Sequence, residues 1–189
     1  PALKRLQPRG LSTTKPGSLL KRSIPIRTFA QWDDARPGFV EVDLVAHCGD
    51  STRGEYLNTL NMVDVKPRWT EFLALINRSQ RAAVAAIDVC RSHLPYPLQG
   101  LDSDNGSEFI NHNLKRYCEQ KGITFTRCRP YRKNDQAYVE QKNWTVIRQI
   151  VGYDRYEGIA AHQALSALYE PLRLYVNFFQ PVMTLVCKQ

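Results

Sequence analysis

The sequence has 189 residues, of which 43% are hydrophobic, and a formal net charge of +8. This length and composition allow a buried core, so we expect one catalytic-sized domain with appendages. The sequence contains no apolar stretch of the roughly 18 residues that a membrane-spanning helix requires, and its basic start lacks the apolar segment of a signal peptide. We therefore expect a cytoplasmic protein with no membrane partner.

The five cysteines form no Cys-x-x-Cys pair, so neither a structural zinc site nor a disulfide framework is predicted. Positive charge gathers near the start of the chain, where these basic residues precede the first acidic residue, Asp33: Lys4, Arg5, Arg9, Lys15, Lys21, Arg22 and Arg27. Residues 1–37 are also rich in Pro, Gly and Ser, which predicts a basic extended arm or linker. Such an arm favours a polyanion, most simply nucleic acid, with a solvated tail as the alternative.

The folded part is expected to begin near Gly38. Apolar side chains alternate in FVEVDLVAH, residues 39–47, and this period of two predicts a strand. Two more strands are predicted at residues 56–65 and 68–76, with a turn about Lys66 and Pro67. Three consecutive strands imply an antiparallel meander.

Helices and strands alternate in the rest of the chain. Ser79 is predicted to cap a helix over residues 80–94, and Gly122 to end a later one. The remaining predicted elements are a strand at 98–102, a helix at 113–121, a strand at 123–128, and helices at 137–151 and 159–179, the last kinked or broken at Pro171. The fold class predicted from this order is α/β, with a mixed five-stranded sheet flanked by helices.

Three acidic residues stand in unusual places. Asp43 lies in a strand expected to be central, and Asp104 directly follows the fourth strand, where α/β sheets commonly bind ligands. Glu140 falls inside the apolar arc of its predicted helix, as do Asn143, Trp144 and Ile150. A carboxylate on a packed face is costly unless it is paired or bound to a metal. The simpler alternatives are a hydrogen-bonded core residue for Asp43, a tight turn at Asp104 and a buried salt bridge at Glu140.

The segments that carry these acids, VEVDLVAH, DSDNGSEFIN and NDQAYVEQKN, resemble the three motifs of the DDE integrase and transposase superfamily, found in retroviral integrases and bacterial insertion-sequence transposases. Asp104 and Glu140 have 35 residues between them, which matches the D,D-35-E spacing of the retroviral-type branch. The resemblance implies a ribonuclease H-like fold. It places the catalytic core at residues 38–155 and a C-terminal helical extension at residues 156–189.

The resemblance also implies the site. Asp43, Asp104 and Glu140 would be the catalytic residues and the ligands of two Mg²⁺ or Mn²⁺ ions, which prefer oxygen ligands and suit in-line displacement at phosphorus. Asp102 lies too early in its strand to be the second acid. The candidate DNA contacts are Asn105, Arg132, Lys133, Lys142, Asn143 and Arg148.

The implied function is metal-dependent hydrolysis that exposes a 3′-hydroxyl at a DNA end, followed by strand transfer to a target phosphodiester. The implied partners are element-end and target DNA and further copies of the chain, in a homodimer or higher assembly, acting on bacterial chromosomal or plasmid DNA in the cytoplasm. We expect an upstream module to recognise the element ends. Two alternatives stay open: a ribonuclease H-like nuclease that cuts without joining, and a DNA-binding derivative without catalysis.

Overall fold

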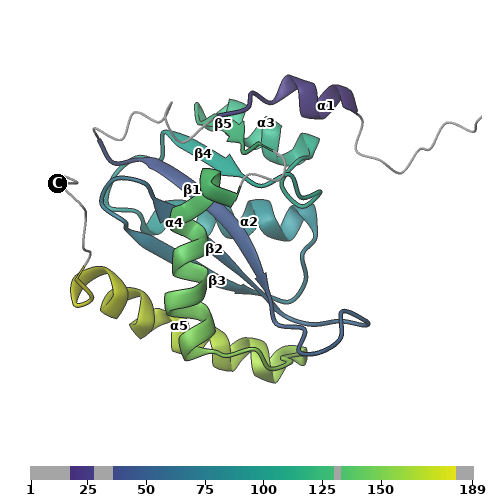
Figure 1. Ribbon diagram of the computed structural model, residues 1–189, viewed down its shortest axis with the longest axis vertical. Helices are drawn as coiled ribbons and strands as arrows, with labels where there is room; N and C mark the ends of the chain where they lie inside the picture. Colours follow the sequence, from purple (N-terminus) through teal and green to yellow (C-terminus); the bar gives the residue numbers. More distant parts are fainter. Residues whose placement is uncertain (1–17, 28–35, 130–132, 182–189) are drawn as a thin grey trace, which may run out of the picture.

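Five strands form one sheet in the order β3-β2-β1-β4-β5 (Figure 1). The computed structural model describes residues 18–27, 36–129 and 133–181. The strands are β1 (Phe39–Ala46), β2 (Asn58–Asp64), β3 (Thr70–Leu75), β4 (Gly100–Ser103) and β5 (Thr124–Arg127). The pairs β1–β2 and β2–β3 are antiparallel, whereas β1–β4 and β4–β5 are parallel. The predicted mixed sheet, with an antiparallel meander first, is therefore confirmed.

Two of the helices begin and end at the predicted signals. Ser79 caps α2 (Gln80–His93), where its hydroxyl accepts a hydrogen bond from the Ala82 amide. Gly122 ends α3 (His112–Lys121) in the left-handed conformation, at a φ of 68°. The other helices are α1 (Ser18–Ser23), the 3₁₀ turn η2 (Lys133–Gln136), α4 (Ala137–Lys142), the π-helical turn η3 (Asn143–Arg148) and α5 (Gly158–Phe178). None of the helices in the described ranges has the length and hydropathy needed to cross a membrane.

Helices cover both faces of the sheet (Figure 1). On one face, α2 and α3 pack on apolar side chains such as Val40, Val42 and Leu60. On the other, η3 and α5 enclose a second core that includes Val45 and Phe72. Because side chains alternate along a strand, Glu41 and Asp43 point to this second face, where α4 and η3 lie.

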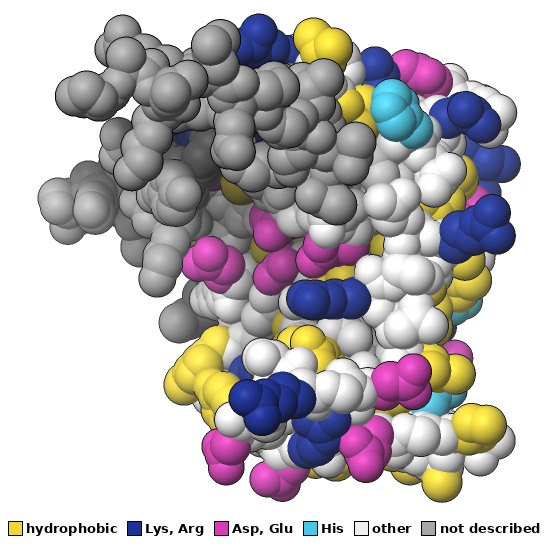
Figure 2. Space-filling view, turned by 90° about the vertical axis from the view of Figure 1, so that its right-hand side faces the viewer, with side chains coloured by type: hydrophobic (Ala, Val, Ile, Leu, Met, Phe, Trp, Pro, Cys, Tyr) yellow, Lys and Arg dark blue, Asp and Glu magenta, His cyan; other side chains and the backbone are white. Residues whose placement is uncertain are grey.

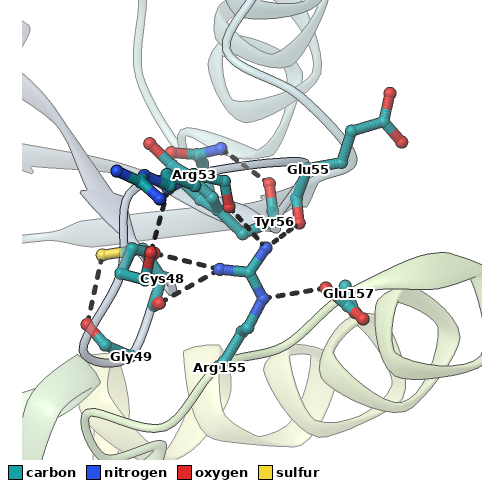
Figure 3. A network of polar contacts seen from close by, with 9 residues as sticks. Cys48, Gly49, Arg53, Glu55, Tyr56, Arg155 and Glu157 are labelled. Atoms are coloured by element: carbon teal, nitrogen blue, oxygen red, sulfur yellow. Dashed lines mark hydrogen bonds and ion pairs between the residues drawn. The ribbon is translucent and has the colours of Figure 1, made fainter.

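The loop between β1 and β2 is held by Arg155, which precedes α5 (Figure 3). Its guanidinium donates hydrogen bonds to the carbonyl oxygens of Cys48, Ser51, Arg53 and Glu55, at 2.7–3.3 Å. Its Nε also forms an ion pair of 2.8 Å with the carboxylate of Glu157. One side chain thus ties the loop after β1 to the start of α5.

The first segment differs from its prediction. Residues 18–23 form helix α1 rather than an extended arm, and Leu20 and Ile24 are buried in the core beside α2 and α3. The gain from burying these two apolar side chains explains the helix. Residues 1–17 and 28–35 of the expected arm lie outside the described residues, and the predicted domain boundaries stay predictions.

Of the kink or break expected at Pro171, the structure excludes the break, because helix α5 continues through this residue. A second expectation is wrong in part. Around Glu140, the predicted apolar arc holds for Val139, Val146 and Ile147, which are buried, but Glu140 itself is exposed, as are Trp144 (57%) and Ile150 (47%). The i→i+5 turn of η3 rotates the side chains that come after it, such as Ile150, away from a pattern that assumes 100° per residue.

We predict that the docking of α5 is a main source of stability. Leu165 is buried against the second core, whereas Leu174 on the same helix is 45% exposed. Leu165→Ala should lower the free energy of unfolding by about 2–5 kcal/mol, and the matched control Leu174→Ala should change it by less than about 0.5 kcal/mol. Urea unfolding measures both, and equal losses would contradict this packing.

Candidate functional site

Asp43 lies in the middle of β1, and its carboxylate is held in place from both sides. Asn143 Nδ2, on η3, donates to Asp43 Oδ2 at 2.8 Å, and the Leu44 amide donates to Oδ1 at 2.8 Å. The side-chain oxygen Oδ1 of Asn143 accepts a 2.8 Å hydrogen bond from Asn61 Nδ2, on β2. Asn61 is the register partner of Asp43. The amide of Asn143, predicted to contact DNA, therefore links β1, β2 and η3.

Asp104 directly follows β4, as predicted. The parallel register pairs Val42 with Ser103, so Asp104 leaves its strand beside Asp43. Its Oδ1 accepts a 2.8 Å hydrogen bond from the Gly106 amide. The tight turn that was the simpler interpretation of this segment is therefore present, and it orients the carboxylate.

The third acid, Glu140, lies on the exposed side of α4. Its negative charge nevertheless acts electrostatically on Asp43. Burial is the main reason why the pKa of Asp43 is raised to about 6, and the negative charges of Asp104 and Glu140 add to this increase, while the Leu44 amide and Asn143 oppose it. The pKa of Asp104 is also raised, chiefly by burial and further by Glu108. The structure thus brings the three acids into one electrostatic field.

The donor chemistry of these acids suits a hard cation. Carboxylate oxygens are the ligands that Mg²⁺ and Mn²⁺ prefer. Burial raises the pKa of Asp43, and a cation would relieve the repulsion from Asp104 and Glu140 that adds to this increase. In the part of the chain that the structure describes, however, no three His, Cys, Asp or Glu side chains lie close enough together to hold a metal ion. The acids therefore fit the metal in type, but have to approach one another to bind it.

Most predicted DNA contacts make hydrogen bonds within the chain. Asn105 donates to the carbonyl oxygen of Cys128 and accepts from Arg127. Arg148 donates to the carbonyl oxygens of Ala46 and Gly152.

Lys142 is half-buried, with its Nζ 3.4 Å from Gln180 Oε1, and burial lowers its pKa. Arg132 and the side chain of Lys133 lie outside the described residues. The structure therefore leaves these DNA contacts as predictions.

Two buried carboxyl groups beside the site were not predicted. Glu41 and Asp102 are register partners on β1 and β4, and each is at most 1% exposed. Burial raises the pKa of Glu41 to about 8 and that of Asp102 to about 7. The signal in the sequence was that Glu41 shares the strand face of Asp43, two residues away.

Comparison with known proteins places the chain in a family. Residues 33–133, which include Asp43 and Asp104, match the Integrase core domain. The chain belongs to this family. It is also 47% identical over 164 residues to "Uncharacterized protein y4rM" of Sinorhizobium fredii (strain NBRC 101917 / NGR234). That alignment covers 87% of this chain and 47% of the relative, so the chain spans about half the length of its curated relative.

Two solved structures share the fold of this integrase core domain. The catalytic core of BIV integrase aligns with a TM-score of 0.57 at 18% identity, over 77% of this chain and 87% of that one. A simian T-cell lymphotropic virus intasome, in complex with PP2A regulatory subunit B56 gamma, aligns with a TM-score of 0.63 at 17% identity, over 86% of this chain and 54% of that one. The predicted ribonuclease H-like fold is therefore confirmed.

We predict that the buried Asp102 makes stability depend on pH. Its pKa rises from 3.8 to about 7 on folding, so the folded state holds the proton more tightly, and the stability that this proton gives is lost as the pH rises through about 7. The wild type should therefore lose stability between pH 5 and pH 8, whereas Asp102→Asn should not. Over this range, the free energy of unfolding of the variant should rise by about 1 kcal/mol or more relative to that of the wild type. Urea midpoints at the two pH values test this.

The control for this comparison is Asp50→Asn, which changes an exposed aspartate in the loop after β1. Its difference from the wild type should be the same at both pH values. A pH-independent difference for Asp102→Asn would contradict the prediction.

Proposed function

We propose that this integrase core is the catalytic core of a bacterial DNA transposase or integrase, which hydrolyses a DNA end and transfers the resulting 3′-hydroxyl to a target phosphodiester. The observation that supports the proposal is that three acids stand on neighbouring elements: Asp43 on β1, Asp104 directly after the adjacent strand β4, and Glu140 on α4. Burial raises the pKa of Asp43, and the charges of Asp104 and Glu140 add to this increase. Carboxylates that repel one another in this way are typical of a site that binds cations.

In this proposal, Asp43, Asp104 and Glu140 hold two Mg²⁺ or Mn²⁺ ions. When bound, such ions activate the attacking oxygen and stabilise the leaving one in displacement at phosphorus. The chain's own residues orient the ligands: Asn143 holds Asp43, and the Gly106 amide holds Asp104. Among the described residues, no side chain or amide holds the Glu140 carboxylate in this way. In this proposal, its distance from Asp43 and Asp104 depends on the position of α4.

The proposed partners are DNA and further copies of the chain. Figure 2 shows several acidic side chains next to one another in the middle of one face, while Lys, Arg and further acidic side chains lie elsewhere on the same surface. Together with the net charge of +8, this distribution supports binding of phosphates around a metal-binding centre. The intasome that shares the fold supports the same proposal.

We predict that the three acids are needed for catalysis and that Asp102 is not. Asp104→Asn and Glu140→Gln should abolish nicking and joining of a branched DNA substrate with Mn²⁺, because each removes a charged metal ligand. Asp102→Asn, in which the change lies within β4, should keep most of the activity. Circular dichroism of each variant controls for folding.

The products separate this proposal from its alternatives. Joined strands that disappear in Glu140→Gln support a transposase core. Cleavage without joining would indicate a nuclease. DNA binding without either product, in the wild type with Mn²⁺, would indicate a derivative without catalysis and contradict the proposal.

We also predict that DNA affinity falls steeply with salt, because phosphate contacts release counterions. Changing Arg132 and Lys133 together to Gln should lower the slope of log K against log salt by about 2, about one for each contact. Arg81→Gln, on α2 at the opposite face of the sheet, is the matched control and should leave the slope unchanged. A salt-independent affinity, measured by fluorescence anisotropy, would contradict phosphate-dominated binding.

A further inference from the structure

Helix α4, which carries Glu140, begins without a cap of its own. The first amides of a helix have no acceptor within that helix and need one from elsewhere. The residue in the cap position, Gln136, makes no side-chain hydrogen bond to these amides. The short helix therefore depends on another part of the fold to satisfy its first turn.

Glu41 supplies the missing acceptor from β1. Its Oε2 accepts hydrogen bonds from the amides of Tyr138, at 3.0 Å, and Val139, at 2.9 Å. Glu41 is 1% exposed, so water does not compete for these bonds. A carboxyl oxygen is well suited to this place, because the N-terminal end of a helix carries a partial positive charge.

The segment before α4 is fixed by a second carboxylate. Asp135, which is 2% exposed, accepts hydrogen bonds from Arg129 Nη2 at 2.7 Å and Nε at 2.8 Å. The Gln136 amide group lies 3.4 Å from the backbone oxygen of Asp102, on β4. The start of α4 is thus attached to two neighbouring strands, to β1 through Glu41 and to β4 through Asp102.

We propose that Glu41 is a positioning residue that sets where Glu140 lies relative to Asp43 and Asp104. Glu41 and Asp43 stand two residues apart on the same face of β1, so one rigid strand carries the first acid and also holds the helix of the third. Glu140 is exposed, and its placement follows from the anchoring of α4. This inference rests on the function proposed above.

Two readouts test the role of Glu41. In the wild type, the Tyr138 and Val139 amides should be protected from hydrogen exchange, although first-turn amides ordinarily exchange fast. In Glu41→Ala, their exchange should become at least about tenfold faster, and Mn²⁺-dependent strand joining should fall by about 100-fold, as expected for a displaced catalytic group. The dissociation constant for DNA should stay unchanged.

Two variants separate positioning from general stability. Glu41→Gln keeps a carbonyl oxygen that can accept the same amides, so it should restore protection and most of the joining activity. Glu71→Ala removes an equally buried carboxylate on β3 that contacts Trp69 and Arg173. It should lower stability without selectively exposing the two amides or abolishing joining.

Several outcomes would overturn the inference: unprotected amides in the wild type, no rescue by Glu41→Gln, or an equal loss of joining in Glu71→Ala. If Glu41→Ala does not fold, the wild type and Glu41→Gln still decide the matter. If the wild type joins no DNA, the proposed function fails together with the catalytic part of the inference, whereas hydrogen exchange separately decides whether Glu41 anchors α4.

Discussion

The alternation of side chains along β1 is the constraint on which the rest of the structure depends. Val40 and Val42 point into the core under α2, and the residues between and after them, Glu41 and Asp43, point to the opposite face. A shift of one residue in register would exchange the two sets and bury the carboxylates in an apolar core. The strand therefore sets the core and the candidate site at the same time.

This arrangement has an electrostatic cost. The pKa values of Glu41, Asp43 and Asp102 are all raised, in each case mainly by burial, so their ionised forms are less favourable in the folded protein than in water. Hydrogen bonds oppose this effect. The α4 amides lower the pKa of Glu41, and the Leu44 amide and Asn143 lower that of Asp43. These carboxyl groups lie on the interior strands β1 and β4, and burying them there lowers stability, which is typical of functional sites.

The elements after the sheet complete the site from its second face. Helix α5 packs its buried side chains on β3, and Arg155 ties the segment before α5 to the loop that follows β1. The turn η3 places Asn143 where its side chain donates a hydrogen bond to Asp43. The proposed site is thus assembled from segments about 100 residues apart, and its geometry depends on the packing of α4, η3 and α5.

The sequence alone determined the chain order of the strands and of the helices from residue 80 onward, and the caps at Ser79 and Gly122. It also placed Asp102 within a strand and Asp104 after it. These features follow from hydrophobic periodicity, capping residues and turn residues, which are all local signals. The sequence also pointed to the family through three short motifs. Tertiary structure decided the rest: the helix at residues 18–23, the exposure of Glu140, the contacts of Asn143 with Asp43 and Asn61, and the anchoring of α4 by Glu41. These features arise from contacts between distant segments and from a π-helical turn, which local periodicity does not encode.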